Sequence, residues 1–277
     1  MIVDILALQS FYETPLGRTA QRFVGRALVD FLRGVKDARV LGLGYCPPYL
    51  RPALARAERV NLLMPARQGV GHWPSETANL AFLADPLMLP LPDAAYDRAI
   101  VAHLLETTED PDELLHELWR TLAPGGRVAI VTPNRRGVWA RVDATPFGQG
   151  RPYSRSQLAD LLARNSFAAE KWTEALYVPP IASDAFLRTA GAWERFGTRL
   201  SAPFAGIIVV EAVKQAPRPI PARVARRRLT FAPALSPSPA PAAAPAPLVP
   251  GTRLRAGAGN RASPALSIGD EETPRSG

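Results

Sequence analysis

The side chains best suited to chemistry follow short apolar runs that are typical of buried strands. His103 comes directly after the run from Tyr96 to Ala102, and its imidazole could serve as a base or contact a ligand. A hydrogen-bonded histidine at the edge of a sheet explains the same position without catalysis. His72 and His116 are scattered and no paired acids accompany them, so the sequence predicts no metal site.

A second group of reactive side chains lies in the segment 133–155, which holds five arginines and one aspartate. Aromatic rings are interleaved with these arginines. This combination suits a small anionic or aromatic substrate, or a nucleic-acid surface. Arginines that pair with surface acids, and rings that close the core, are the alternative explanation. The residues of this segment that we expect to contact substrate are Arg135, Arg136, Trp139 and Tyr153.

His103 and the segment 133–155 can form one site only if the strands that precede them end side by side in a sheet. Strand-like apolar runs cover residues 39–43, 60–64, 79–83, 96–102 and 128–131, and helical patterns lie between most of them. The alternation predicts an α/β fold built from βαβ units, with a doubly wound parallel sheet covered by helices on both faces. Ligands bind such sheets in the crevice at the carboxyl ends of the strands, so the loops there are the expected site.

Capping signals locate some of the helices. Asp110 as N-cap and Pro111 at the first helical position predict the start of one helix, and Ser154 with Gln157 forms a capping-box pair that starts another. The other expected elements are helices over residues 6–33, 47–57 and 184–196 and late strands over 171–177 and 206–213.

Proline and charge are unevenly distributed along the chain. Of the 29 prolines, 12 lie in residues 216–277, together with nine arginines and three acids. This segment therefore carries a net charge of +6, which leaves +2 of the total of +8 for residues 1–215. We expect a disordered Pro/Ala/Arg-rich tail over 216–277, in which Arg223 and the run 226–228 belong to a solvated basic linker or to an anion-binding surface.

The chain carries no sign of export or membrane insertion. It begins Met1-Ile-Val-Asp and contains no stretch that approaches 18 apolar residues, so we expect neither a signal peptide nor a membrane span. Cys46 is the single cysteine, which excludes an internal disulfide and fits a reducing compartment. The expectation is a cytoplasmic protein without a membrane partner.

Two stretches resemble a known family in order and spacing. They are Ala84-Asp-Pro-Leu-Met-Leu-Pro-Leu-Pro-Asp, continuing to Glu106, and Asp110-Pro-Asp-Glu-Leu-Leu-His-Glu-Leu-Trp-Arg-Thr-Leu-Ala-Pro-Gly-Gly. Both look like the central block of class I S-adenosylmethionine-dependent methyltransferases of the small-molecule type, which include quinone-ring methyltransferases. The resemblance covers roughly residues 38–135. It implies a seven-stranded Rossmann-like methyltransferase fold that ends in an antiparallel strand pair.

The resemblance also implies a cofactor, a domain layout and roles for individual residues. S-adenosylmethionine would be the cofactor, bound by an α/β domain over 38–215 behind an N-terminal helical cap over 1–37. Asp85 stands where the family accepts a hydrogen bond from the adenine amino group, with Pro86 against the ring. A solvated turn aspartate is the alternative. His103 would face the cofactor, and Tyr12 of the N-terminal helices would cap the crevice on the substrate side.

The glycine-rich turn departs from the family pattern. After the first strand the chain has Val40-Leu-Gly-Leu-Gly-Tyr-Cys-Pro-Pro, in which Gly44 aligns with the first glycine of the family and Gly42 takes the acidic position. Met64 stands where the second strand normally ends in the acid that holds the ribose hydroxyls. Two carboxylate acceptors are therefore missing from the expected cofactor contacts Gly42, Gly44 and Met64. The loop after Met64 offers Gln68 as a substitute acceptor.

Three functions follow from these observations. The leading hypothesis is a methyltransferase that acts on a small acceptor, with Asp85 holding adenine and His103 as the base. A non-catalytic member that keeps the fold to bind a ligand or partner is the alternative, because two acids are missing and Cys46 and Pro48 take the places of two later glycines. RNA methylation is the third, with Arg135 and Arg136 as the RNA contacts; a small-molecule partner is favoured over nucleic acid.

Overall fold

The computed structural model of the chain describes residues 4–199 and 204–216. The tail expected over 216–277 lies outside the described residues except for Ala216, and so do Arg223 and the run 226–228.

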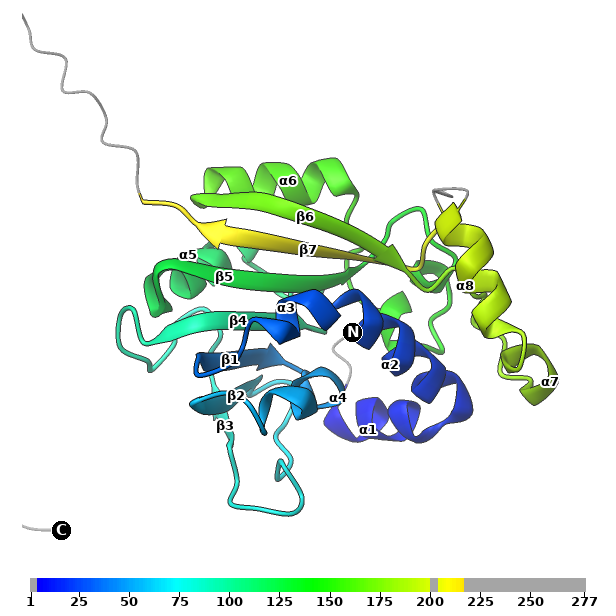
Figure 1. Cartoon of the computed structure of the whole chain (residues 1–277), viewed down its shortest axis with the longest axis horizontal. Helices are drawn as coiled ribbons and strands as arrows, with labels where there is room; N and C mark the ends of the chain where they lie inside the picture. The colour runs from blue at the N-terminus through cyan, green and yellow to red at the C-terminus, as the bar shows by residue number, and fades with distance from the viewer. Residues whose placement is uncertain (1–3, 200–203, 217–277) are drawn as a thin grey trace, which may run out of the picture. The chain divides into compact units, whose positions relative to one another are not determined.

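A seven-stranded sheet in the order β3-β2-β1-β4-β5-β7-β6 forms the centre of the fold (Figure 1). Neighbours from β3 to β5 pair in parallel, whereas β7 runs antiparallel to both β5 and β6. This confirms the predicted doubly wound, mostly parallel sheet with a final antiparallel pair. The strands are β1 (Arg39–Gly44), β2 (Arg59–Pro65), β3 (Ala81–Ala84), β4 (Tyr96–Ala102), β5 (Leu122–Pro133), β6 (Phe167–Ala175) and β7 (Ile207–Lys214).

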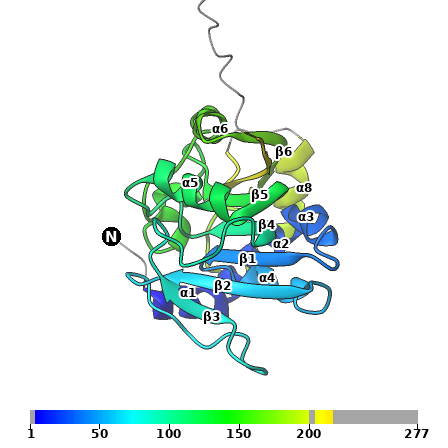
Figure 2. The same cartoon turned by 90° about the vertical axis from the view of Figure 1, so that its left-hand side faces the viewer.

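Helices cover both faces of the sheet (Figures 1 and 2). One apolar core lies under the N-terminal helices and the other under α5 and α6. None of the helices in the described ranges is long and apolar enough to span a bilayer. The helices are α1 (Ile5–Glu13), α2 (Pro15–Ala27), α3 (Val29–Arg33), α4 (Pro47–Leu50), α5 (Pro111–Thr121), α6 (Arg155–Arg164), α7 (Asp184–Leu187) and α8 (Ala190–Arg199).

The two capping signals confirm the predicted helix starts. The carboxylate of Asp110 accepts hydrogen bonds from the backbone N–H groups of Asp112 and Glu113 at the start of α5. At the start of α6, Ser154 and Gln157 exchange side-chain and backbone hydrogen bonds as a reciprocal capping box. Local side-chain chemistry fixes both starts because the first N–H groups of a helix have no partner within the helix.

Three expected helices are shorter or interrupted. The helical stretch over 6–33 is broken at Thr14, whose hydroxyl accepts from the N–H of Gly17 and caps α2, and again at Leu28. The helix expected over 47–57 ends at Leu50 and continues only as a 3₁₀ turn over Arg51–Ala53, because Pro52 has no N–H to donate. The helix expected over 184–196 is divided into α7 and α8.

The ends of β1 and β4 approach each other closely at Gly44. Its φ of +80° lies in the left-handed region, and a Cβ there would stand 2.3 Å from the carbonyl oxygen of Ala102. The same Cβ would stand 2.7 Å from Cβ of Leu104. Only glycine fits this position, because both the conformation and the space exclude a side chain.

We expect Gly44→Ala to destabilise the fold by roughly 3 to 5 kcal/mol, the sum of a left-handed alanine and a backbone clash. Gly125→Ala is the matched control, since its φ is +72° and no atom lies within 4 Å of the added Cβ. The control should cost only about 1 to 2 kcal/mol. Urea denaturation of both variants measures the difference, and equal losses would show that the close approach at Gly44 is not constraining.

Candidate functional site

The strand order reverses between β1 and β4, which is where a doubly wound sheet binds its ligands. Gly44 ends β1 and Ala102 ends β4, and the two residues are paired in the sheet register. His103 follows with a φ of +52°, an uncommon conformation for a residue that carries a side chain. Conformations of this kind often accompany functional sites. The close approach of the two strands therefore fixes where the His103 side chain leaves the backbone.

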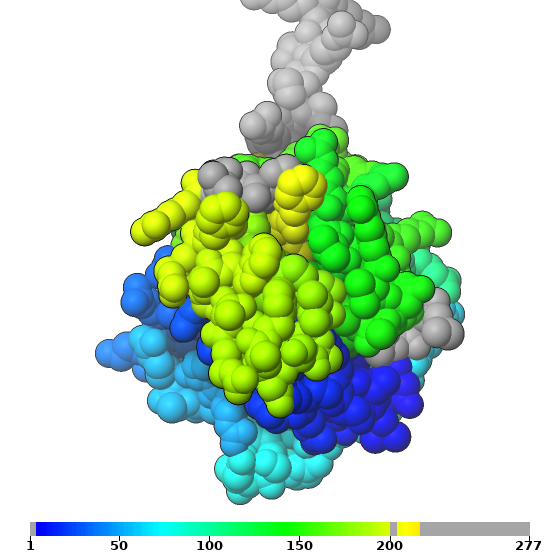
Figure 3. Space-filling model, turned by 90° about the vertical axis from the view of Figure 1, so that its right-hand side faces the viewer, coloured from blue at the N-terminus to red at the C-terminus, as the bar shows by residue number. Residues whose placement is uncertain are grey.

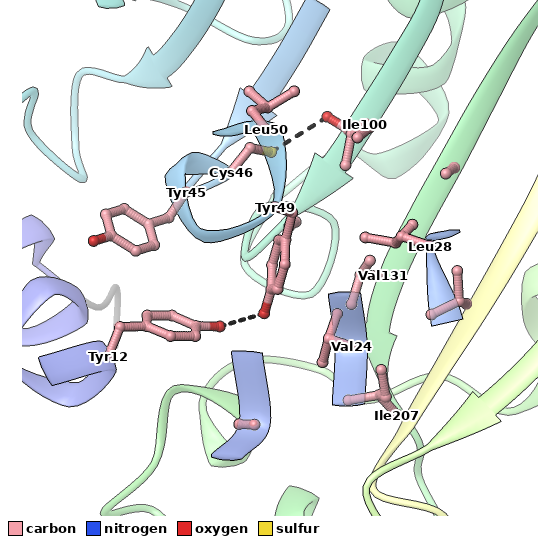
Figure 4. Packing of buried hydrophobic residues seen from close by; sticks show 14 of the residues in the cluster. Tyr12, Val24, Leu28, Tyr45, Cys46, Tyr49, Leu50, Ile100, Val131 and Ile207 are labelled. Carbon is pink, nitrogen blue, oxygen red and sulfur yellow. Dashed lines mark hydrogen bonds between the residues drawn. The ribbon is translucent and has the colours of Figure 1, made fainter. Parts of the chain in front are cut away.

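His103 is buried in a chain of hydrogen-bonded polar groups. Nε2 of His103 lies 2.6 Å from the hydroxyl of Tyr12, which in turn lies 2.5 Å from the hydroxyl of Tyr49. Figure 4 shows Tyr12 reaching from α1 toward Tyr49 of α4. Burial lowers the pKa of His103 to about 3 and raises the pKa values of both tyrosines. The imidazole is therefore neutral at physiological pH, and both phenols keep their protons.

Glu106 lies on the other side of the imidazole. Its Oε1 is 3.6 Å from Nδ1 of His103, and its side chain is buried. Burial raises the pKa of Glu106 to about 8, so a carboxylic acid and a neutral imidazole face each other rather than an ion pair. Oε2 of Glu106 has no hydrogen-bond partner among the described residues. If Tyr12 donates to Nε2, the N–H of His103 is at Nδ1 and points to the carboxyl group.

Aromatic rings surround the imidazole. The centroid of Phe147 lies 4.9 Å from that of His103, and Tyr12 and Tyr45 lie 5.8 Å and 6.5 Å away. Phe11 meets the edge of Phe147 at 6.2 Å, between α1 and the loop after β5. The surroundings of His103 are therefore largely apolar.

A cavity of about 210 Å³ lies between the loops that follow β2, β3 and β4; Leu104, the residue after His103, lines it, whereas the His103 side chain does not. Asp85, Pro86 and Leu87 line it from the loop after β3. The carboxylate of Asp85 is exposed, and its Oδ1 accepts from the N–H of Leu87, which leaves Oδ2 available to a ligand. Leu104 connects the cavity to the paired ends of β1 and β4, because it lies against Gly44.

Gln68 lines the same cavity from the loop after β2. Its side chain is buried, and its Nε2 donates to the carbonyl oxygen of His103 at 3.3 Å. Its Oε1 has no hydrogen-bond partner among the described residues. Because a buried acceptor without a partner costs free energy, this oxygen suits a ligand donor such as a hydroxyl group. The loop that the sequence offered as a substitute thus places an amide at the cavity.

Four expected cofactor contacts do not line the cavity, namely Gly42, Gly44, Met64 and His103. Gly42 is covered by α4, since an added Cβ would stand 2.3 Å from a methyl group of Leu50. Met64 is buried in the core under the N-terminal helices. Neither residue lines the cavity, so the two positions that carry acids in the family contribute packing here.

The expected substrate residues divide into two groups. Tyr12 reaches His103, whereas Trp139 is fully buried and donates its Nε1 hydrogen to the carbonyl oxygen of Val178 at 2.7 Å. Arg135 and Arg136 are exposed, and Arg135 lines a separate groove of about 650 Å³ with Tyr153. The structure therefore joins only Tyr12 to the buried polar cluster.

Two members of the polar cluster around His103 were not predicted from the sequence. Glu106 follows His103 by three residues within the family-like stretch, and this short spacing was the available signal. Tyr49 carries no such signal, because its hydroxyl meets Tyr12 only through the packing of α1 on α4.

Comparisons with known proteins agree with this architecture. A family model described as a methyltransferase domain matches residues 24–130. A demethylmenaquinone methyltransferase of Thermus thermophilus is 30% identical over 164 residues, which cover 57% of this chain and 66% of that protein. A probable S-adenosylmethionine-dependent methyltransferase of Mycolicibacterium smegmatis is 29% identical over 170 residues, or 57% of this chain and 58% of that protein. The matched part spans less than two thirds of either relative.

A solved structure shares the fold. It is an S-adenosylmethionine-dependent methyltransferase from Archaeoglobus fulgidus, with a TM-score of 0.51 at 17% identity over 70% of this chain and 94% of that chain.

Glu106 and His103 should give the fold a distinctive pH dependence. The carboxyl group titrates near 4.5 unfolded and about 8 folded, so its contribution to stability is complete below 4.5 and is lost as the pH rises through 8. The imidazole titrates near 6.5 unfolded and about 3 folded, so its contribution is present above 6.5 and is lost as the pH falls toward 3. The two slopes oppose each other between 4.5 and 6.5, and only that of Glu106 remains from 6.5 to 8.

We therefore expect the free energy of unfolding to fall by roughly 1 kcal/mol per pH unit between pH 6.5 and 8. Glu106→Gln should flatten this interval, whereas Glu113→Gln, at an exposed position of α5, should not. Denaturant unfolding across the interval measures the slopes. A slope that survives in Glu106→Gln would mean that Glu106 is ionised in the folded protein.

Proposed function

We propose that this chain, whose residues 24–130 match a methyltransferase domain, is an S-adenosylmethionine-dependent methyltransferase that transfers a methyl group to a small aromatic acceptor. The observation that carries the proposal is the buried, neutral His103 at the end of β4, next to a cavity that is lined by Asp85 and by Gln68, whose Oε1 has no hydrogen-bond partner among the described residues.

The residues present fit S-adenosylmethionine. Gln68 and Asp85 line the cavity from the loops after β2 and β3, and Oε1 of Gln68 and Oδ2 of Asp85 are acceptors without a hydrogen-bond partner among the described residues. We assign Asp85, Pro86 and Leu87 to the adenine and Gln68 to the ribose hydroxyls. When bound, this cofactor supplies a methyl group on a positively charged sulfur, open to direct displacement.

His103 is the proposed base. Its imidazole is unprotonated throughout the physiological range, but a pKa of about 3 makes it a weak base, so the role requires that the bound substrate and cofactor raise that pKa. Its Nε2 is engaged by Tyr12, so the proton reaches it either after Tyr12 moves aside or through the Tyr12 hydroxyl. Glu106 faces Nδ1 and fixes the orientation of the ring. Most of the rate enhancement would come from holding the reacting groups in line.

An aromatic acceptor fits the surroundings of His103. Phe11 and Phe147 meet edge to face at 6.2 Å between α1 and the loop after β5, and an acceptor ring inserted there would lie next to the imidazole. A relative of this chain is named for a quinone acceptor. We propose a hydroquinone-like acceptor bound between the rings of Phe11 and Phe147; Arg135 lines a separate groove and so is not assigned to it.

A non-catalytic binding protein is the second candidate. Gly42 and Met64 take the places of two family acids, and both are packed away from the cavity. Loss of two acceptors favours weaker or altered cofactor binding. The two candidates differ in whether the folded chain binds S-adenosylmethionine and turns it over.

We expect Asp85→Asn to weaken binding of S-adenosylmethionine by about 1 to 3 kcal/mol, because asparagine keeps the acceptor for Leu87 N–H but loses the second oxygen. Gln68→Leu should weaken binding by a similar amount. Isothermal titration calorimetry of the full chain measures both.

Asp143→Asn, an exposed aspartate outside the cavity, is the control and should bind as the parent does. Parent-like affinity in Asp85→Asn would remove that residue from the site. No heat from the folded parent at high micromolar ligand would favour the binding protein.

His103→Asn should lower methyl transfer to hydroquinones by about 10²- to 10⁴-fold while leaving cofactor affinity within a few fold. Release of S-adenosylhomocysteine with hydroquinones of one or two fused rings provides the assay. His116→Asn, on α5, is the control and should retain activity. Equal loss in both variants, or an unchanged rate in His103→Asn, would exclude His103 as the base.

A further inference from the structure

A groove of about 740 Å³ runs between α2 and the α7–α8 segment, away from the cavity beside His103. Figure 3 shows this face, with α7 and α8 in yellow-green against the blue N-terminal helices. The charged residues that line the groove are Arg18, Arg22, Arg26, Arg188, Arg195 and Asp184, a net charge of +4. We call this feature the arginine groove. It holds more net positive charge than the whole of residues 1–215, whose sum is +2.

None of these five arginines forms an ion pair with a carboxylate within the described ranges 4–199 and 204–216. Arg22 and Arg26 lie over the ring of Phe23 at 4.8 Å and 5.4 Å, and Arg18 donates to the carbonyl oxygen of Glu13. By contrast, Arg39, Arg120 and Arg164 elsewhere on the fold are each paired with acids.

The acids near the arginine groove do not neutralise it. Asp184 is exposed and lines the wall formed by α7. Glu194 on α8 accepts the backbone N–H groups of Leu176 and Tyr177, so its carboxylate is directed into the fold. Burial raises the pKa of Glu194, and the positive charge of Arg26 partly offsets that rise. The groove therefore has donors in excess on both walls.

The spacing of the arginines follows the walls of the groove. Arg18, Arg22 and Arg26 stand four residues apart on α2, so they form one row with steps of about 6 Å. Arg188 and Arg195 face them from the α7–α8 side. Two rows of guanidinium groups along a concave channel fit a flexible chain of phosphates, because arginine binds phosphate through paired donors.

We propose that the arginine groove binds single-stranded RNA. The phosphates would lie between the two rows of arginines, and Asp184 gives the groove an acceptor for a ribose 2′-hydroxyl, which DNA lacks. This proposal is independent of the acceptor that the methyltransferase site takes.

The shape of the face favours RNA over an anionic bilayer. Trp193 and Phe196 are exposed on α8, but Gly191 and Arg195 of the same helix face the groove. Trp193 is two residues from each of these, about 200° around the helix axis. A flat bilayer that received the Trp193 ring would not reach the arginines inside the groove. A single strand can lie in the groove itself.

The test is fluorescence anisotropy of a labelled 12-nucleotide oligouridylate with the full chain at 50 to 300 mM salt. Each phosphate contact contributes roughly 0.7 to the slope of log affinity against log salt. The triple variant Arg18→Gln/Arg22→Gln/Arg26→Gln should therefore reduce the magnitude of this slope by about 2. At the lower salt concentrations it should also bind more than tenfold more weakly. The control Arg56→Gln/Arg59→Gln/Arg155→Gln removes three arginines outside the groove and should keep the parental slope.

The deoxy strand and Asp184→Ala test the ribose contact. The parent should bind RNA about tenfold more tightly than the DNA strand of matching sequence, and Asp184→Ala should abolish that preference. Equal parental affinity for the two strands would overturn the assignment to RNA.

Two other results would overturn the groove as the site. The first is an unchanged salt slope in the α2 triple variant, with thermal unfolding showing it folded, which would place RNA binding elsewhere in the chain. The second is binding to vesicles of phosphatidylcholine and phosphatidylglycerol that depends on Trp193 and Phe196, without binding of RNA.

Discussion

The contact between Gly44 and the end of β4 is the constraint on which the site depends. It lies where β1 pairs with β4 and the strand order reverses, and the chain leaves the sheet directly after Ala102. His103 leaves β4 in a left-handed conformation, so its imidazole points into the protein and Leu104 lines the cavity. A side chain at Gly44 would move Leu104, and with it one wall of the cavity.

The polar chain from Tyr49 to Glu106 links the N-terminal helices to the sheet. Tyr12 belongs to α1, Tyr49 to α4 and His103 to the end of β4, so two short hydrogen bonds join three elements. Burying these groups in their uncharged forms avoids the cost of desolvating an ion pair. The N-terminal helices are also continuous with the apolar core on that face of the sheet. Access to His103 is therefore coupled to the stability of α1.

Local signals in the sequence predicted the elements but not the contacts between them. β4 and the starts of α5 and α6 follow from apolar runs and caps, which act within a few residues. The break at Thr14 was missed, because a capping threonine before proline competes with an otherwise continuous helical pattern. Tyr49 was missed because its partner is 37 residues away in sequence. The arginine groove was missed for the same reason, since its two walls come from segments far apart in the sequence, residues 15–26 and 184–195.

The site retains hydrogen-bond acceptors while it gives up charge. Gln68 lines the cavity with an amide whose buried Oε1 has no hydrogen-bond partner among the described residues, and burial keeps Glu106 protonated at neutral pH. Asp85 is the carboxylate that remains on the wall after β3, while Glu109 on the opposite loop is paired with Arg67. Around His103, next to this crevice, the rings of Tyr12 and Tyr45 stack at 5.7 Å and no ionised carboxylate contacts the imidazole. Recognition at this crevice would rest on ring faces and uncharged acceptors more than on ion pairing.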